Sequence, residues 1–215
     1  HLFVWTRVVN PIVGVLVAFA ALSLAWKLSE EKKIHHALLL ALFLALSVGY
    51  FFGFAVCYVF IGLLAVFALL QKEYKVAALF AISIVLSVVI DASYWHHSLT
   101  MLGGAVGKAV SLKNGMFFTH VPVINNLVTA ASVVIVLLLG YMYATSREIL
   151  VSAKRTWVFV VAMLLTSWIV FAQQLVTGRT IWPDHFVQFT IPLVMVSLLS
   201  SSALVFSLKF PKLWS

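Results

Sequence analysis

Residues 37–70 form a nearly unbroken apolar stretch, and this feature most constrains how the chain can fold. As one straight helix the stretch would reach roughly 50 Å, whereas the hydrocarbon core of a bilayer is about 30 Å thick. The segment VGYFFGF offers a break, because Gly49 and Gly53 permit the tight turn that two consecutive spans need. The sequence therefore predicts a hairpin of two spanning helices, one on each side of this turn.

The composition extends this conclusion to the whole chain. Hydrophobic residues make up 64% of the 215 positions and charged residues only 9%, and the mean hydropathy is +1.13. Soluble domains are about half apolar and about one quarter charged. We therefore expect an integral membrane protein that contacts the lipid bilayer. The net charge of +8 does not indicate a nucleic-acid partner, because basic residues in such chains mark cytoplasmic loops.

Seven apolar segments have the length that a spanning helix needs. They are Val8–Trp26, Ile34–Tyr50, Phe54–Leu70, Tyr74–Ile90, Val123–Tyr143, Trp157–Leu175 and Phe186–Leu208. Several lie near the lower end of the roughly 17–25 residues expected for a span. The sequence therefore predicts an all-α, polytopic bundle of about seven transmembrane helices, in a single transmembrane domain that covers residues 1–215.

The basic residues predict the orientation of this bundle. The connections KLSEEKK, QKEYK and TSREILVSAKR and the C-terminal tail hold ten of the fourteen Lys and Arg residues. An excess of Lys and Arg marks the cytoplasmic side, so we expect the N-terminus outside and the C-terminus in the cytoplasm. On the outer side, apolar residues at helical spacing predict an interfacial helix or loop at about residues 98–120.

The predicted outer face has few polar residues, and these are the candidates for chemistry. Asp91 and Asp184 are its only acids, and both stand at span ends, where a carboxylate is poorly solvated. Arg179 is suited to a phosphate, which a guanidinium holds through two parallel hydrogen bonds; extension to lipid headgroups explains it equally well. Gln173 and Gln174 precede Arg179 near a span end, so at least one should face protein or a polar cavity.

Other outer residues have both a structural and a functional interpretation. In WPDHF, Asp184 can cap the last span, whereas His185 can bind a headgroup, a sugar or a proton, or be a polar residue of the interface without a function. Arg7 stands before the first span. His96, His97 and His120 are of a residue type that binds zinc, but adjacent histidines rarely point at one ion and no H-E-x-x-H pattern occurs. We therefore expect no metal site in this chain.

Three features together resemble a known family. They are FVWTRVVNPIVGVLVAFAALSLAWKL at the start, the hairpin ALLLALFLALSVGYFFGFAVCYVFIGLLAVFALL, and QQLVTGRTIWPDHFVQFTIP between the last two spans. They are similar to the later membrane half of bacterial multispanning glycosyltransferases of the GT-C class, near the protein O-mannosyltransferases and their lipid-modifying relatives. The resemblance covers most of the chain, and its most specific part is the Gln-Gln, Thr-Gly-Arg and His pattern of the third stretch.

The resemblance implies a function and a location. Such enzymes lie in the bacterial cytoplasmic (inner) membrane and transfer a sugar from a polyprenyl-phosphate donor to an acceptor hydroxyl on its outer face. For this chain it implies that Arg179 binds the lipid phosphate, with His185 and Gln174 as neighbours. Neither the sugar nor the acceptor is identified by it.

One part of the family pattern is missing. The family's catalytic acid lies in its first outer loop, and nothing in this chain corresponds to it. Since the chain also begins at His1 without a signal peptide, we expect an N-terminally truncated fragment of a longer protein. The catalytic residue is then unknown, with Asp91 as the candidate substitute base. The chain itself is expected to hold no cofactor, and a divalent metal would belong to the full-length enzyme.

Two other functions stay open. A small transporter or lipid carrier needs polar residues at the middle of the membrane. The candidates for such a path are Ser47, Ser83, Ser87, Thr166, Ser167 and Gln173. A non-catalytic membrane assembly subunit requires only the spans.

Overall fold

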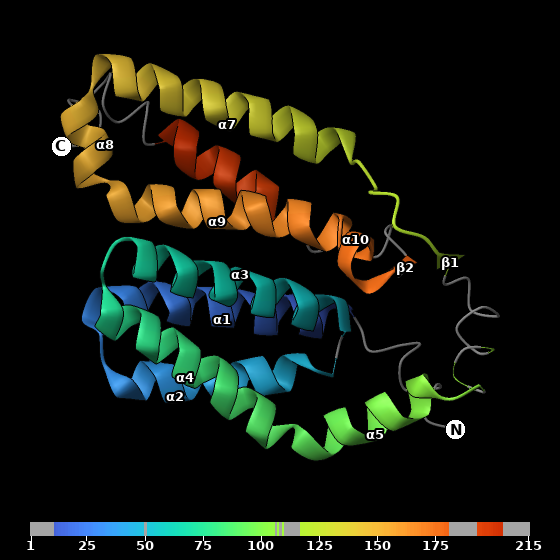
Figure 1. The fold of residues 1–215 in the computed structure, drawn as a ribbon. Coiled ribbons are helices and arrows are strands. Elements are labelled where there is room, and N and C mark those ends of the chain that lie inside the picture. The colour runs from blue at the N-terminus through green and yellow to red at the C-terminus, as the bar shows by residue number, and fades with distance from the viewer. Residues whose placement is uncertain are drawn as a thin grey trace.

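The computed structural model describes residues 11–49, 51–105, 107, 109, 117–180 and 193–203. Helices account for nearly all regular structure in these ranges, so the predicted all-α class is confirmed. The exceptions there are two strands of two residues each, β1 at Phe117–Phe118 and β2 at Arg179–Thr180. Figure 1 shows the helices running roughly side by side, with the strands at one end.

The first four helices form an antiparallel bundle (Figure 1). They are α1 Pro11–Glu31, α2 Ile34–Ser47, α3 Phe51–Leu70 and α4 Tyr74–Ile90. Helix α1 contacts α2 and α3, and α4 closes the bundle against the same two helices. The buried face of α1 carries Ala18, Ala21, Ala25 and Leu28 at helical spacing. Small side chains on such a face let neighbouring helix backbones approach closely, which is how helices associate in lipid.

The predicted break of the long apolar stretch is confirmed. Helix α2 ends at Ser47 and α3 begins at Phe51, with Gly49 in the turn between them. The role predicted for Gly53 is wrong, because this residue is buried inside α3. The turn is thus shorter than the glycine spacing indicates, because α3 already begins before Gly53.

The later helices pack onto this bundle through α9. They are α7 Asn126–Thr145, α8 Arg147–Ser152, α9 Lys154–Phe171, the short α10 Gln174–Thr177, and a further helix at Leu193–Ala203. Helix α9 packs on α3, where the rings of Phe60 and Phe159 lie 5.6 Å apart in an edge-on arrangement. The Asn125 side chain caps α7 by accepting hydrogen bonds from two backbone N–H groups, so this helix begins later than the predicted Val123.

Three described helices are long and apolar enough to cross a membrane, namely Gly53–Leu70, Asn126–Thr145 and Lys154–Phe171. A bent pair, Tyr74–Ile90 and Ala92–Met101, makes a fourth if it counts as one broken span. The structure is therefore compatible with a membrane protein. The predicted seven spans exceed what these helices support, and α2, with 14 residues, is shorter than the usual minimum of about 17 residues. Parts of the predicted first and last spans lie outside the described residues.

The predicted interfacial segment at residues 98–120 is only partly correct. Helix α5, Ala92–Gly103, starts earlier than predicted and follows α4 across a bend of 66° at Asp91. Further along, Phe117 and Phe118 are in β1 rather than in a helix, and residues 110–116 lie outside the described part of the chain. Apolar spacing therefore found the helix but not its bounds.

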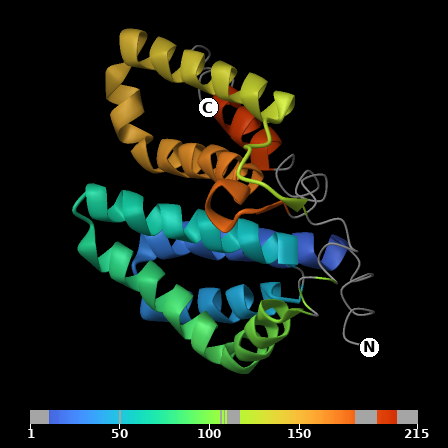
Figure 2. The same cartoon turned by 45° about the vertical axis from the view of Figure 1, so that its right-hand side comes forward.

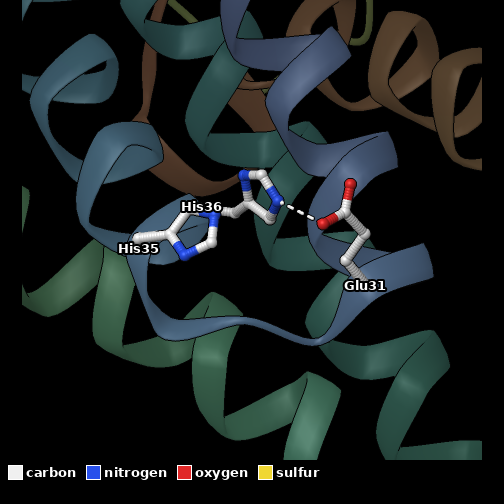
Figure 3. Close-up of side chains that lie close together, drawn as sticks. All are labelled: Glu31, His35 and His36. Carbon is white, nitrogen blue, oxygen red and sulfur yellow. Dashed lines mark ion pairs between the residues drawn. The ribbon is translucent and has the colours of Figure 1, made fainter.

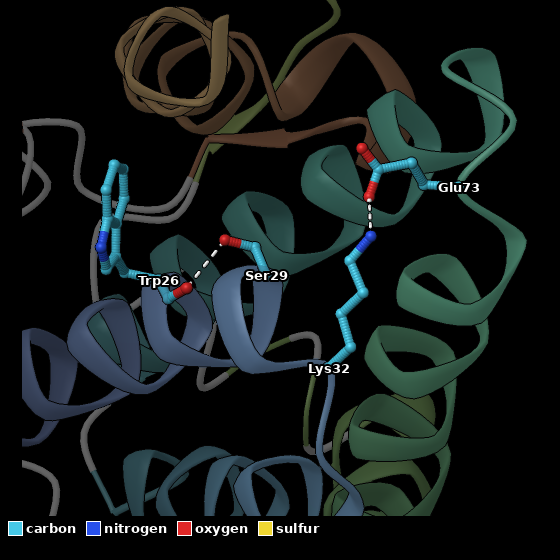
Figure 4. A network of polar contacts seen from close by, with 4 residues as sticks. All are labelled: Trp26, Ser29, Lys32 and Glu73. Atoms are coloured by element: carbon cyan, nitrogen blue, oxygen red, sulfur yellow. Dashed lines mark hydrogen bonds and ion pairs between the residues drawn. The ribbon is translucent and has the colours of Figure 1, made fainter. Parts of the chain in front are cut away.

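The two ends of the bundle carry different elements and connections, which can be followed in Figure 2. One end gathers the connections α1–α2, α3–α4 and α8–α9, and we call it the basic end. There the Lys32 ammonium lies 3.0 Å from the Glu73 carboxylate (Figure 4), and the Arg155 guanidinium lies 3.3 Å from that of Glu30. The other end, which we call the strand end, carries α5, α10 and the β1–β2 pair. Basic residues from distant parts of the sequence thus meet at one end.

Candidate functional site

The strand end joins a segment that precedes α7 to the segment that follows α10. Strands β1 and β2 pair antiparallel, with Phe118 opposite Arg179 and Phe117 opposite Thr180. The N–H of Thr119 adds a hydrogen bond to the Gly178 carbonyl over 3.1 Å. The backbone of Arg179 is therefore held by the sheet beside a segment about sixty residues earlier in the sequence.

Gly178 lets the backbone turn sharply from α10 into β2, which begins at Arg179. Its φ of 64° is left-handed, a conformation that glycine adopts without strain and that ends α10. A Cβ at this position would lie 3.1 Å from Cε1 of His120, so the imidazole fills the space that the missing side chain leaves. His120 Nδ1 is also 3.1 Å from the Leu175 carbonyl oxygen. His120 therefore packs against the α10 turn, and no metal cluster of described residues includes it.

The two predicted glutamines have different surroundings. Gln174 is 2% exposed, and its side-chain Nε2 donates to the Val121 carbonyl oxygen over 3.0 Å. Gln173 is half-buried, and its Oε1 accepts a hydrogen bond from the Thr177 hydroxyl over 2.7 Å. The expectation that at least one amide faces protein is confirmed by Gln174. Its contact explains the residue structurally, while binding of a substrate by either glutamine stays a prediction.

Asp91 stands at the bend between α4 and α5. Its Oδ2 is buried and has no hydrogen-bond partner in the described part of the chain, and the same holds for Nε1 of Trp95. Beside them, the Tyr58 and Ser87 hydroxyls lie 2.6 Å apart, and the Phe54 ring stacks at 4.8 Å from Trp95. An unpaired buried carboxylate oxygen is costly, which makes Asp91 unusual among the described residues of this end.

The other predicted site residues are not brought together by the described structure. His96 and His97 are exposed on α5, and no metal cluster among the described residues includes them. Arg7, Asp184 and His185 lie outside the described residues. Their predicted roles therefore stay predictions.

The polar residues proposed for a transport path are satisfied locally. The hydroxyls of Ser47, Ser87, Thr166 and Ser167 each donate to a carbonyl of their own helix, three or four residues earlier. The Ser83 hydroxyl lies 2.9 Å from Leu79 O and 3.0 Å from Ala37 O. Because these hydroxyl protons are donated within the helices, the contacts account for the residues without a polar path, and the transporter alternative stays a prediction.

The basic end holds a cavity that the sequence did not indicate. It has a volume of about 280 Å³, and its lining combines apolar side chains of α3, α4 and α9 with polar ones, among them Ser29, Gln71, Ser152 and Arg155. Its walls come from connections that are far apart in the sequence, so no local motif could have identified it.

No protein-family model, curated protein or solved structure matches this chain.

Proposed function

We propose that this chain is the membrane-embedded part of a bacterial inner-membrane glycosyltransferase that uses a polyprenyl-phosphate-linked sugar. In this proposal about seven helices cross the bilayer, the N-terminus is outside, and the C-terminus is in the cytoplasm. The Arg179 guanidinium binds the donor phosphate at the outer surface, with Gln173, Gln174 and His185 as neighbours. The acceptor hydroxyl is activated by a carboxylate that lies either elsewhere in a longer chain or at Asp91.

The segregation of charge supports the orientation. The basic end joins connections that contain Lys32, Lys72, Lys154 and Arg155, and ion pairs to Glu30 and Glu73 hold these connections together. Such an accumulation of Lys and Arg is typical of the cytoplasmic side. The strand end then faces outward, on the side where lipid-linked sugars are used by the enzymes that this chain resembles.

The β1–β2 pairing is the observation that carries the proposal. It fixes the backbone of Arg179 at the strand end, while the buried Gln174 amide anchors the preceding turn to Val121. A phosphate ligand must be held in a defined position to contribute to transfer, because positioning supplies much of the rate enhancement. A loosely attached arginine that only contacts headgroups needs no such support.

The decisive experiment is transfer from a polyprenyl-phosphate sugar, measured in membranes with the full-length protein. We expect Arg179→Ala to lower transfer by about tenfold or more, since a hydrogen bond to a charged group contributes about 1.5–3 kcal/mol. Arg179→Lys should retain part of the activity because it keeps the charge but loses the bidentate geometry. Arg147→Ala, at the basic end, is the matched control and should transfer like the parent protein. Unchanged turnover in Arg179→Ala would exclude the proposed role.

A further inference from the structure

A cluster of side chains that could bind a metal ion lies at the basic end, away from the strand end. Helix α1 ends at Glu31, and α2 begins two residues after the turn at Lys32, whose φ of 52° is left-handed. This tight reversal brings Glu31 close to His35 and His36 (Figure 3). One ligand atom from each of the three side chains lies within 4.8 Å of the other two.

His36 is buried, but the described structure gives its ring nitrogens no hydrogen-bond partner. It is 8% exposed, and its Nε2 lies 3.1 Å from Oε2 of Glu31, at ion-pair distance but without hydrogen-bond geometry. Buried polar side-chain atoms are nearly always hydrogen-bonded, so an imidazole in this state needs a partner.

We propose that Glu31, His35 and His36 bind a divalent transition-metal ion of the zinc type. Adjacent histidines rarely point at one ion, but the ring centroids of His35 and His36 lie 4.1 Å apart here. Two imidazoles and a carboxylate are the protein ligands of many zinc sites that keep a fourth position for water. Ligand atoms around a tetrahedral zinc lie roughly 3.4 Å apart, given bonds of about 2.0–2.1 Å. Since the side chains of Glu31 and His35 are exposed, modest rotations bring the three ligand atoms into that range around the buried His36. The inference is independent of the glycosyltransferase proposal.

Lys33 is the competitor for this site. Its ammonium lies 2.7 Å from Oε2 of Glu31. The Lys33 ammonium, and after it the nearby His36 ring, lower the pKa of the Glu31 carboxyl to about 2, so the carboxylate is ionised at neutral pH. A metal ion must displace the Lys33 ammonium to bind this oxygen. Removing the positive charge of Lys33 should therefore tighten metal binding. If the cluster were held together only by the Lys33–Glu31 ion pair, the same change would loosen it instead.

The test uses the whole chain in detergent micelles with Co²⁺ as the probe. Tetrahedral Co²⁺ with imidazole ligands gives visible absorption bands, and Zn²⁺ should displace the ion and abolish them. We expect one bound ion per chain. His36→Ala or Glu31→Gln should weaken binding by about tenfold or more, which is the scale reported for loss of supporting residues in metal sites. Lys33→Gln should instead bind Co²⁺ more tightly than the parent protein.

The chain offers a matched control for adjacent histidines. His96 and His97 also follow each other on a helix, and they are exposed and outside the cluster. The His96→Ala/His97→Ala variant should bind Co²⁺ like the parent protein. Circular dichroism of each variant checks that the helices are retained. Absence of saturable binding, or equal loss of binding in the control variant, would overturn the proposal, as would weaker binding in Lys33→Gln.

Discussion

The side-chain amide of Gln174 donates a hydrogen bond to the Val121 carbonyl over 3.0 Å, across 53 residues of sequence. Together with the β1–β2 pair, this contact fastens the connection before α7 to the turn after α9. The strand end therefore has a defined backbone, although it is built from connections rather than from spans.

Loss of the Gln174 amide should loosen this end. Gln174→Ala leaves the Val121 carbonyl without its partner and removes a fully buried side chain, so we expect the free energy of unfolding to fall by about 1–3 kcal/mol. Gln173→Ala, at a half-buried position, should cost about 0.5 kcal/mol or less. Unfolding in mixed detergent micelles, followed by circular dichroism, measures both. Equal effects of the two substitutions would contradict the anchoring role of Gln174.

Gly178 should tolerate no side chain. Gly178→Ala forces a non-glycine residue to a φ of 64° and places a Cβ 3.1 Å from the His120 ring. We expect a loss of about 1–2 kcal/mol of stability from the left-handed conformation alone. In a His120→Ala background the cost should fall but not vanish, because the crowding is relieved and the backbone strain stays. A double-mutant cycle of thermal unfolding separates the two contributions, and a cycle without coupling would show that the ring does not crowd this position.

The orientation can be tested with single cysteines in intact cells. The only native cysteine, Cys57, is 2% exposed and can be replaced as Cys57→Ala. In that background a membrane-impermeant maleimide should label Val121→Cys, at a position that is 68% exposed at the strand end. Lys72→Cys at the basic end should be labelled only after the membrane is permeabilised. The reverse pattern would place the basic end outside.

The Glu31 ion pairs should give a pH dependence of stability. The pKa of the Glu31 carboxyl falls from 4.5 to about 2 on folding, chiefly through the hydrogen bond from Lys33. A depressed pKa stabilises the folded state above the unfolded value, and this contribution is lost as the pH falls through the folded value. The difference in unfolding temperature between the parent protein and Glu31→Gln should thus be largest above pH 4.5 and shrink toward pH 2. A difference that stays constant across this range would contradict the assignment.

Sequence patterns predicted some helices and turns of this chain correctly and misplaced the ends of others. Apolar length and period predicted α4 at Tyr74–Ile90 and the reversal near Gly49, because both follow from local hydrophobicity and backbone freedom. Helix ends were less well predicted. The predicted span Trp157–Leu175 begins at Lys154 and ends at Phe171, since the polar Gln173 and Gln174 turn away into a separate short helix.

The sequence did not single out the cluster of Glu31, His35 and His36, and no metal site was expected from it. His96 and His97 were considered as metal ligands from composition, yet the histidines that approach a carboxylate are His35 and His36. The pattern EEKKIHH held a signal, because a connection of two residues must fold the acid back onto the histidines. The proximity of Glu31 to the two histidines can be predicted from this pattern only once the ends of α1 and α2 are known.

The sequence by itself determined that this chain forms apolar helices, where its longest apolar stretch reverses, and which connections carry its basic residues. These properties depend on residues within one or two helical turns of each other, which local hydrophobicity and charge describe well. Only the tertiary structure decided that Gln174 meets Val121, that Phe118 pairs with Arg179, and that Glu31 lies against a buried His36. The first two contacts depend on segments more than fifty residues apart in sequence, and the third depends on where α1 and α2 end and on the direction of single side chains, none of which a local hydrophobic pattern encodes.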